Sequence, residues 1–71
     1  MTMYNAEYHP ISKENLDWML LGESKENQDI ILAEVEKAKA NKTRNYLITL
    51  PNGDWYQINN GQVIGSKNTA E

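Results

Sequence analysis

Apolar residues recur with helical spacing in two stretches of the first half of the chain. In the first stretch, Ile11 and Leu16 flank a serine at the spacing of a hydrophobic staple, which fixes how a chain enters a helix. Ser12 is the expected N-cap, because its hydroxyl can accept a hydrogen bond from a free amide of the first turn. Gly22 suits the position just after a helix. These signals predict a helix over about residues 13–21. Its apolar face carries Leu16, Met19 and Leu20.

The second helical stretch begins after Ser24, which is again the expected N-cap. No glycine or proline interrupts residues 25–41, and Ile31, Val35 and Ala38 follow the spacing of one helix face. Acidic residues near its start and lysines near its end suit the helix dipole. With such a short link between them, the two helices are expected to form an antiparallel hairpin.

The pattern changes after the second helix, where short runs of β-forming residues alternate with turn signals. Residues 44–50 and 54–58 read as strands on either side of a Pro-Asn-Gly turn. An Asn-Gly pair at residues 60–61 then leads into a short third strand at residues 62–64. The sequence therefore predicts a three-stranded antiparallel meander.

The first hairpin has two possible registers, and they bury different residues. A two-residue Asn-Gly turn would pair Leu50 with Trp55 and bury the indole. A three-residue Pro-Asn-Gly loop would pair Ile48 with Tyr56 instead and gather the apolar residues on one face. We favour the second register, because strand register usually follows the buried face.

The predicted fold class is α+β, a helical hairpin packed on one face of a three-stranded antiparallel β-meander in the order ααβββ. The second turn is expected to pair Ile58 with Val63. Residues 1–10 are interpreted as an N-terminal arm, residues 11–65 as the single domain, and residues 66–71 as a disordered tail. The expected core consists of Ile11, Leu16, Met19, Leu20, Ile31, Val35, Ala38, Tyr46, Ile48, Tyr56, Ile58 and Val63.

Composition narrows the classes of function. A chain of 71 residues holds one domain at most, and with 39% apolar residues most of them are needed in its core. The absence of cysteine excludes disulfides and thiolate metal sites. Because no secretory signal and no membrane-length apolar run is visible, a cytoplasmic location is expected.

Residues with catalytic chemistry are few, and most have structural explanations. His9 is the only histidine, so no second histidine or cysteine completes a metal site with it. Ser12 and Ser24 are explained as helix caps, and Asp54 as the residue after a tight turn. The glycines are scattered and form no phosphate-binding loop. We expect no catalysis, no cofactor, no metal and no small-molecule substrate.

The second face of the meander provides the candidate binding residues. In the favoured register it carries Leu47, Thr49, Trp55 and Gln57. One layer of helices covers one side of a sheet, which would leave this tryptophan and leucine open to a partner. Trp18, which lies off the main face of the first helix, is a possible second anchor. The competing interpretation is that the N-terminal arm folds over this face.

These residues lead to the functional hypothesis of a small, non-catalytic protein-binding or regulatory module. Its partner is expected to be another protein or a second copy of the chain, through the sheet face or a strand edge. A chain this short would also suit an accessory or inhibitor protein of a phage or mobile element.

An alternative hypothesis is nucleic-acid binding, and it rests on the charge distribution. Residues 1–36 carry eight acids and two bases, a net charge of −6, whereas residues 37–71 carry five bases and two acids, a net charge of +3. A cluster of Lys37, Lys39, Lys42 and Arg44 could hold phosphates while hairpin aromatics stack on bases. The simpler explanation is that lysines near a helix end complement its dipole. The overall net charge of −3 also disfavours a polyanionic partner.

Overall fold

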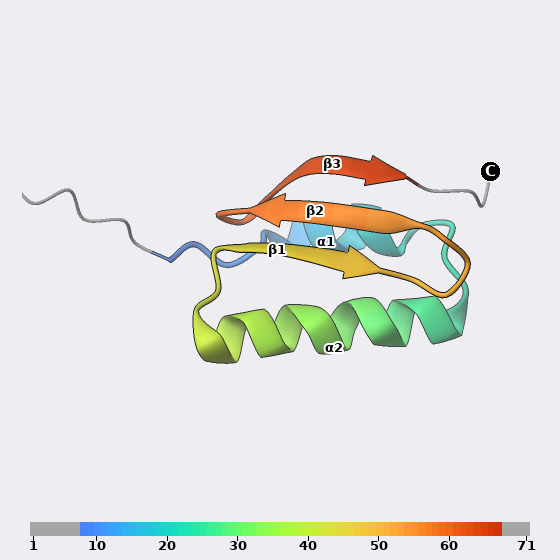
Figure 1. The fold of residues 1–71 in the computed structure, drawn as a ribbon, viewed down its shortest axis with the longest axis horizontal. Helices are drawn as coiled ribbons and strands as arrows, with labels where there is room; N and C mark the ends of the chain where they lie inside the picture. Colours follow the sequence, from blue (N-terminus) through green and yellow to red (C-terminus); the bar gives the residue numbers. More distant parts are fainter. Residues whose placement is uncertain (1–7, 68–71) are drawn as a thin grey trace, which may run out of the picture.

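The computed structural model describes residues 8–67 and confirms the predicted α+β class, as Figure 1 shows. Two helices are followed by one antiparallel sheet with the strand order β1-β2-β3. The elements are α1 (Lys13–Leu20), α2 (Lys25–Asn41), β1 (Asn45–Thr49), β2 (Trp55–Asn59) and β3 (Gln62–Lys67). Neither helix in this part of the chain is long and apolar enough to cross a membrane.

Both helices begin at the predicted caps. The Ser12 hydroxyl accepts a hydrogen bond from the backbone amide of Asn15 at 3.1 Å, and the Ser24 hydroxyl accepts one from that of Asn27 at 3.2 Å. Helix α1 ends one residue earlier than expected, and Gly22 follows it with a φ of +79°. The helical hairpin therefore turns at the predicted residues, because each serine cap provides a hydrogen-bond acceptor for a free backbone amide at the start of its helix.

The register of the first hairpin is the one that gathers the apolar face. Ile48 pairs with Tyr56 and Tyr46 pairs with Ile58. The backbone amide of Leu50 donates to the carbonyl of Asp54 at 2.9 Å, which closes the three-residue loop. The alternative register with a two-residue turn does not occur. It would have placed Trp55 on the same face as the buried Leu50 and Ile48.

The second hairpin follows the prediction at its turn and departs from it further along. Ile58 pairs with Val63 as expected, but a bulge follows, so Gly65 rather than Ile64 lies opposite Gln57. After the bulge the ladder resumes, and β3 continues to Lys67, two residues into the segment interpreted as a tail. Residues 68–71 of that predicted tail and residues 1–7 of the predicted arm lie outside the described residues.

The core lies between the helical pair and one face of the sheet (Figure 1). Met19 and Ile31 from the helices and Ile48 and Ile58 from the strands are completely shielded from solvent. Leu50, which is not in the expected core, is also buried. The rest of the expected core is buried or packs partly buried against these residues, which leaves the second face of the sheet without a covering layer among the described elements.

Candidate functional site on the open face of the sheet

The four binding residues predicted on the strands lie together on the sheet face that points away from the helices, called here the open face. Leu47 pairs with Gln57 across β1 and β2, and Thr49 pairs with Trp55. Because alternate residues of a strand point to opposite faces, all four lie opposite the buried Ile48 and Tyr56. Leu47 is 55% exposed, and Thr49 and Gln57 are exposed as well. The four side chains therefore form one continuous surface.

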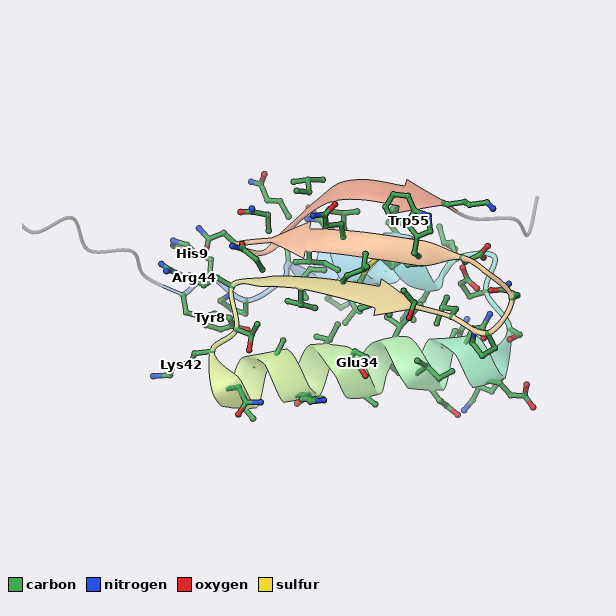
Figure 2. The ribbon with its side chains drawn as sticks, viewed as in Figure 1. Tyr8, His9, Glu34, Lys42, Arg44 and Trp55 are labelled. Carbon is green, nitrogen blue, oxygen red and sulfur yellow. The ribbon has the colours of Figure 1, made fainter. Side chains whose placement is uncertain are left out.

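Trp55 is half-buried by its own sheet and remains accessible (Figure 2). A side-chain carbon added to Gly65 would lie 3.2 Å from the indole atom Cζ3 and 3.5 Å from Cη2, so the ring extends over this glycine of β3. Because glycine has no side chain, it leaves room for the ring. The ring in turn shields the backbone of Gly65 from solvent, as a side chain at that position would otherwise do. This packing holds the indole over the open face.

Charge is almost absent from the strands. Within β1, β2 and β3, Lys67 is the only charged residue, and its pairing with Trp55 places it at the end of the open face. Every acidic residue between positions 8 and 67 except Asp54 belongs to the helical half of the chain. A low charge at the centre of a surface, together with an aromatic residue, is the composition that distinguishes protein interfaces.

The described part of the N-terminal arm does not cover Trp55. A side-chain carbon at Gly61 would lie 2.8 Å from the carbonyl oxygen of His9 and 2.9 Å from that of Pro10, so this segment packs against the second hairpin turn. Trp55 begins β2 and this turn follows its end, and Figure 2 shows His9 and Trp55 at opposite ends of the sheet. The arm residues 8–10 thus leave the indole open.

Trp18 lies on the helical side of the sheet and does not join the open face. Its ring meets that of Tyr56 edge to face, with 6.1 Å between ring centroids and 87° between planes. Tyr56 points into the core, so the two tryptophans lie on opposite sides of the sheet. Trp18 is still 51% exposed, which makes it a core-edge residue rather than part of a common patch with Trp55.

The basic cluster of Lys37, Lys39, Lys42 and Arg44 lies at the end of α2 and the start of β1. All four residues are exposed, and the Lys39 ammonium forms an ion pair with Glu36 at 3.5 Å. Figure 2 shows Lys42 and Arg44 at one end of the sheet and Trp55 at the other. The structure therefore separates the cluster from the tryptophan that was expected to stack on bases beside it.

Tyr46 is the hairpin aromatic that does lie near the basic cluster. It lines a shallow groove between α2 and β1. Burial raises the pKa of the Tyr46 phenol, and the neighbouring Tyr8 phenol raises it further. A phenol in this environment stays neutral at physiological pH and offers no charge to a ligand. The groove is lined by Glu34, Lys37, Ala38, Asn41, Thr43 and Tyr46.

Sequence reasoning missed a buried polar cluster at the end of the molecule near the first hairpin turn. The Tyr56 hydroxyl donates to Glu23 Oε2 at 2.6 Å, and Asn27 Nδ2 donates to Glu23 Oε1 at 3.0 Å. Asp54, two residues before Tyr56, is also completely buried, and its carboxylate oxygen Oδ2 accepts a hydrogen bond from Asn52 Nδ2 at 3.3 Å. These contacts explain why the polar groups tolerate burial.

One sequence signal does mark this cluster. The hydrophobic-staple positions of α2 hold Glu23 and Gln28, although apolar residues are usual there. Instead of an apolar contact, Gln28 Nε2 donates to the backbone carbonyls of Leu20 at 3.0 Å and Glu23 at 3.3 Å. The polar staple thus replaces hydrophobic packing with hydrogen bonds at the helix link.

Among residues 8–67, no three His, Cys, Asp or Glu side chains lie close enough together to hold a metal ion. Comparison of the chain with protein-family models, with curated proteins and with solved structures found no match.

Proposed function

We propose that this protein is a small non-catalytic binding module that docks on another protein through the open face of its sheet. The observation that carries the proposal is the pairing of an accessible tryptophan with a sheet face from which charge is nearly absent. Trp55 and Leu47 supply the apolar contact, while Thr49 and Gln57 supply hydrogen-bonding groups. Tryptophan is enriched among residues that dominate binding energy, and charged residues are depleted at interface centres.

The same features define the partner's chemistry. Its docking surface should be apolar opposite Trp55 and Leu47, and should offer uncharged hydrogen-bonding groups opposite Gln57. A carboxylate of the partner would suit the rim at Lys67, the charged residue that pairs with Trp55. The regulatory or inhibitory role, the cytoplasmic location and the phage or mobile-element setting remain predictions from the sequence.

The test is a site-specific cross-link from the face itself. A photo-reactive amino acid at Gln57 should give a defined adduct with a partner in the source cells, whereas the same group at Leu32, an exposed residue of α2, should not. In the Gln57 version, Trp55→Ala should reduce the adduct at least about tenfold, since truncation of a hot-spot residue costs about 2 kcal/mol or more and about 1.4 kcal/mol is already tenfold. Adducts of equal yield from both positions, or an adduct that ignores Trp55→Ala, would rule out docking through this face.

Trp18→Ala is the matched control, because it removes the more exposed Trp18 from the helical side of the sheet. Docking through the open face predicts that this variant keeps the adduct. Circular dichroism of both variants shows whether each retains its fold. Loss of the adduct in a folded Trp18→Ala protein would instead assign Trp18 to the interface, as the sequence allowed.

The nucleic-acid alternative has its own test, with the opposite expectation. The full chain should show no binding to mixed-sequence oligonucleotides at low salt, where phosphate contacts are strongest. The physical reason is that Lys42 and Arg44 lie at the opposite end of the sheet from Trp55 (Figure 2), that Lys39 pairs with Glu36, and that the chain has a net charge of −3. Salt-sensitive binding that disappears in a Lys42→Glu variant would revive the alternative.

A further inference from the structure

The free edge of β1 presents backbone groups to solvent in a regular row. At one end of this strand the Leu50 amide donates to Asp54, and at the other the Arg44 carbonyl accepts from Asn60 at 2.6 Å. Antiparallel ladders alternate, so residues 44, 46, 48 and 50 bond inward to β2. The amides and carbonyls of Asn45, Leu47 and Thr49 therefore point outward, and no described residue pairs with them because β1 ends the sheet.

The two edges of the sheet differ in how they are protected. The β3 edge carries a bulge, a glycine and the charged Lys67, which are features that discourage pairing with another strand. The strand β1 has the sequence NYLIT and contains no charge, no proline, no glycine and no bulge. Its edge is thus a regular template for an additional strand.

We propose that a second copy of this chain pairs with the β1 edge, antiparallel and about a two-fold axis through Leu47, to form one continuous six-stranded sheet. The inference goes beyond the proposed function, because it concerns the strand edge and a like partner. Across the axis Leu47 meets Leu47 of the second copy, and Asn45 meets Thr49 on either side. Each outward donor then finds an acceptor, and the sequence of the strand is compatible with itself.

The charged residues of α2 that lie next to the β1 edge are compatible with the same two-fold axis. The groove between α2 and β1 brings Glu34, Lys37 and Asn41 alongside Tyr46. The helix runs antiparallel to the strand (Figure 1), so one strand step of about 3.3 Å from Tyr46 to Leu47 corresponds to about two helix residues toward the start of α2.

At the level of the two-fold axis, the nearest part of α2 is therefore the segment between Glu34 and Lys37. This segment lies near the middle of the helix, where Figure 2 shows Glu34. This arrangement brings Glu34 of one copy toward Lys37 of the other, twice in each dimer. The charges attract across the axis, whereas an unrelated extended peptide would have no reason to match them. Pairing at the β1 edge also joins the two open faces side by side, which doubles the docking surface.

The first test is sedimentation equilibrium of the full chain over a wide concentration range, with variants matched between the two edges. Leu47→Lys adds a cation to the β1 edge, and Ile64→Lys adds one to β3, at residues 55% and 57% exposed in the monomer. Wild-type protein should dimerise. Leu47→Lys should raise the dissociation constant at least about tenfold, while Ile64→Lys should leave it unchanged.

Charge reversal tests the axis independently of strand stability. Glu34→Lys should weaken the dimer about fivefold, because it places two lysines across the axis at both contacts. Combining Glu34→Lys with Lys37→Glu restores opposite charges and should restore the wild-type dissociation constant. A double variant as weak as the single variant would overturn the proposed axis.

Other outcomes separate this inference from the proposed function. A monomer at all concentrations, or a dimer broken by Ile64→Lys or by Trp55→Ala as strongly as by Leu47→Lys, overturns pairing at the β1 edge. A monomer that still cross-links to a different protein from Gln57 would leave the proposed function intact. Conversely, a β1-paired dimer whose Gln57 gives no adduct with any other protein would overturn only the proposed function.

Discussion

Replacing Gly61 with alanine is expected to lower the free energy of unfolding by about 3 kcal/mol or more. The glycine has a φ of +87°, which costs an L-residue about 1–2 kcal/mol. The added carbon would also lie 2.8 Å and 2.9 Å from two backbone carbonyl oxygens, those of His9 and Pro10. Backbone atoms cannot move aside as a flexible side chain can, so the segment entering α1 would have to shift.

Gly53→Ala is the matched control for this prediction. Gly53 has a similar φ of +96°, but an added carbon there would meet nothing within 4 Å. The free energy of unfolding of Gly53→Ala should therefore fall only by the conformational cost of about 1–2 kcal/mol. Urea unfolding followed by tryptophan fluorescence measures both variants. Equal losses in the two variants would show that the contact between residues 9–10 and the second turn contributes nothing.

Tyr56→Phe is expected to cost about 2 kcal/mol of stability, although it removes a single oxygen atom. The hydroxyl donates to the buried Glu23 carboxylate at 2.6 Å, and hydrogen bonds to charged groups contribute about 1.5–3 kcal/mol. The variant would thus remove a hydrogen bond from a carboxyl group that is almost completely shielded from solvent, while the bond from Asn27 remains. The loss should be visible as a lower urea midpoint with an unchanged slope.

Tyr46→Phe provides the comparison within the same sheet. Tyr46 is partly buried, and its hydroxyl makes no hydrogen bond to another described residue. Its removal should change stability by no more than about 0.5 kcal/mol. If Tyr56→Phe were as mild as Tyr46→Phe, the bond to Glu23 would not stabilise the fold, and the polar cluster would need another explanation.

The sequence by itself determined the elements of this protein and their order. Ser12 and Ser24 cap the helices they were expected to cap, and the Pro-Asn-Gly and Asn-Gly turns produce the expected pairs of strand residues. These features are readable because each depends on a few neighbouring residues and on one periodicity. The open face followed from the same alternation, which is why its four residues could be named in advance.

Only the tertiary structure decided the contacts between residues distant in the chain. Glu23 and Tyr56 are 33 positions apart, and although a polar residue at the staple position marks Glu23, the sequence does not indicate Tyr56 as its partner. Likewise, packing against Tyr56 placed Trp18 on the opposite side from Trp55, and the length of β1 separated the basic cluster from that indole. Such contacts depend on how whole elements pack together, and local propensity carries no record of that arrangement.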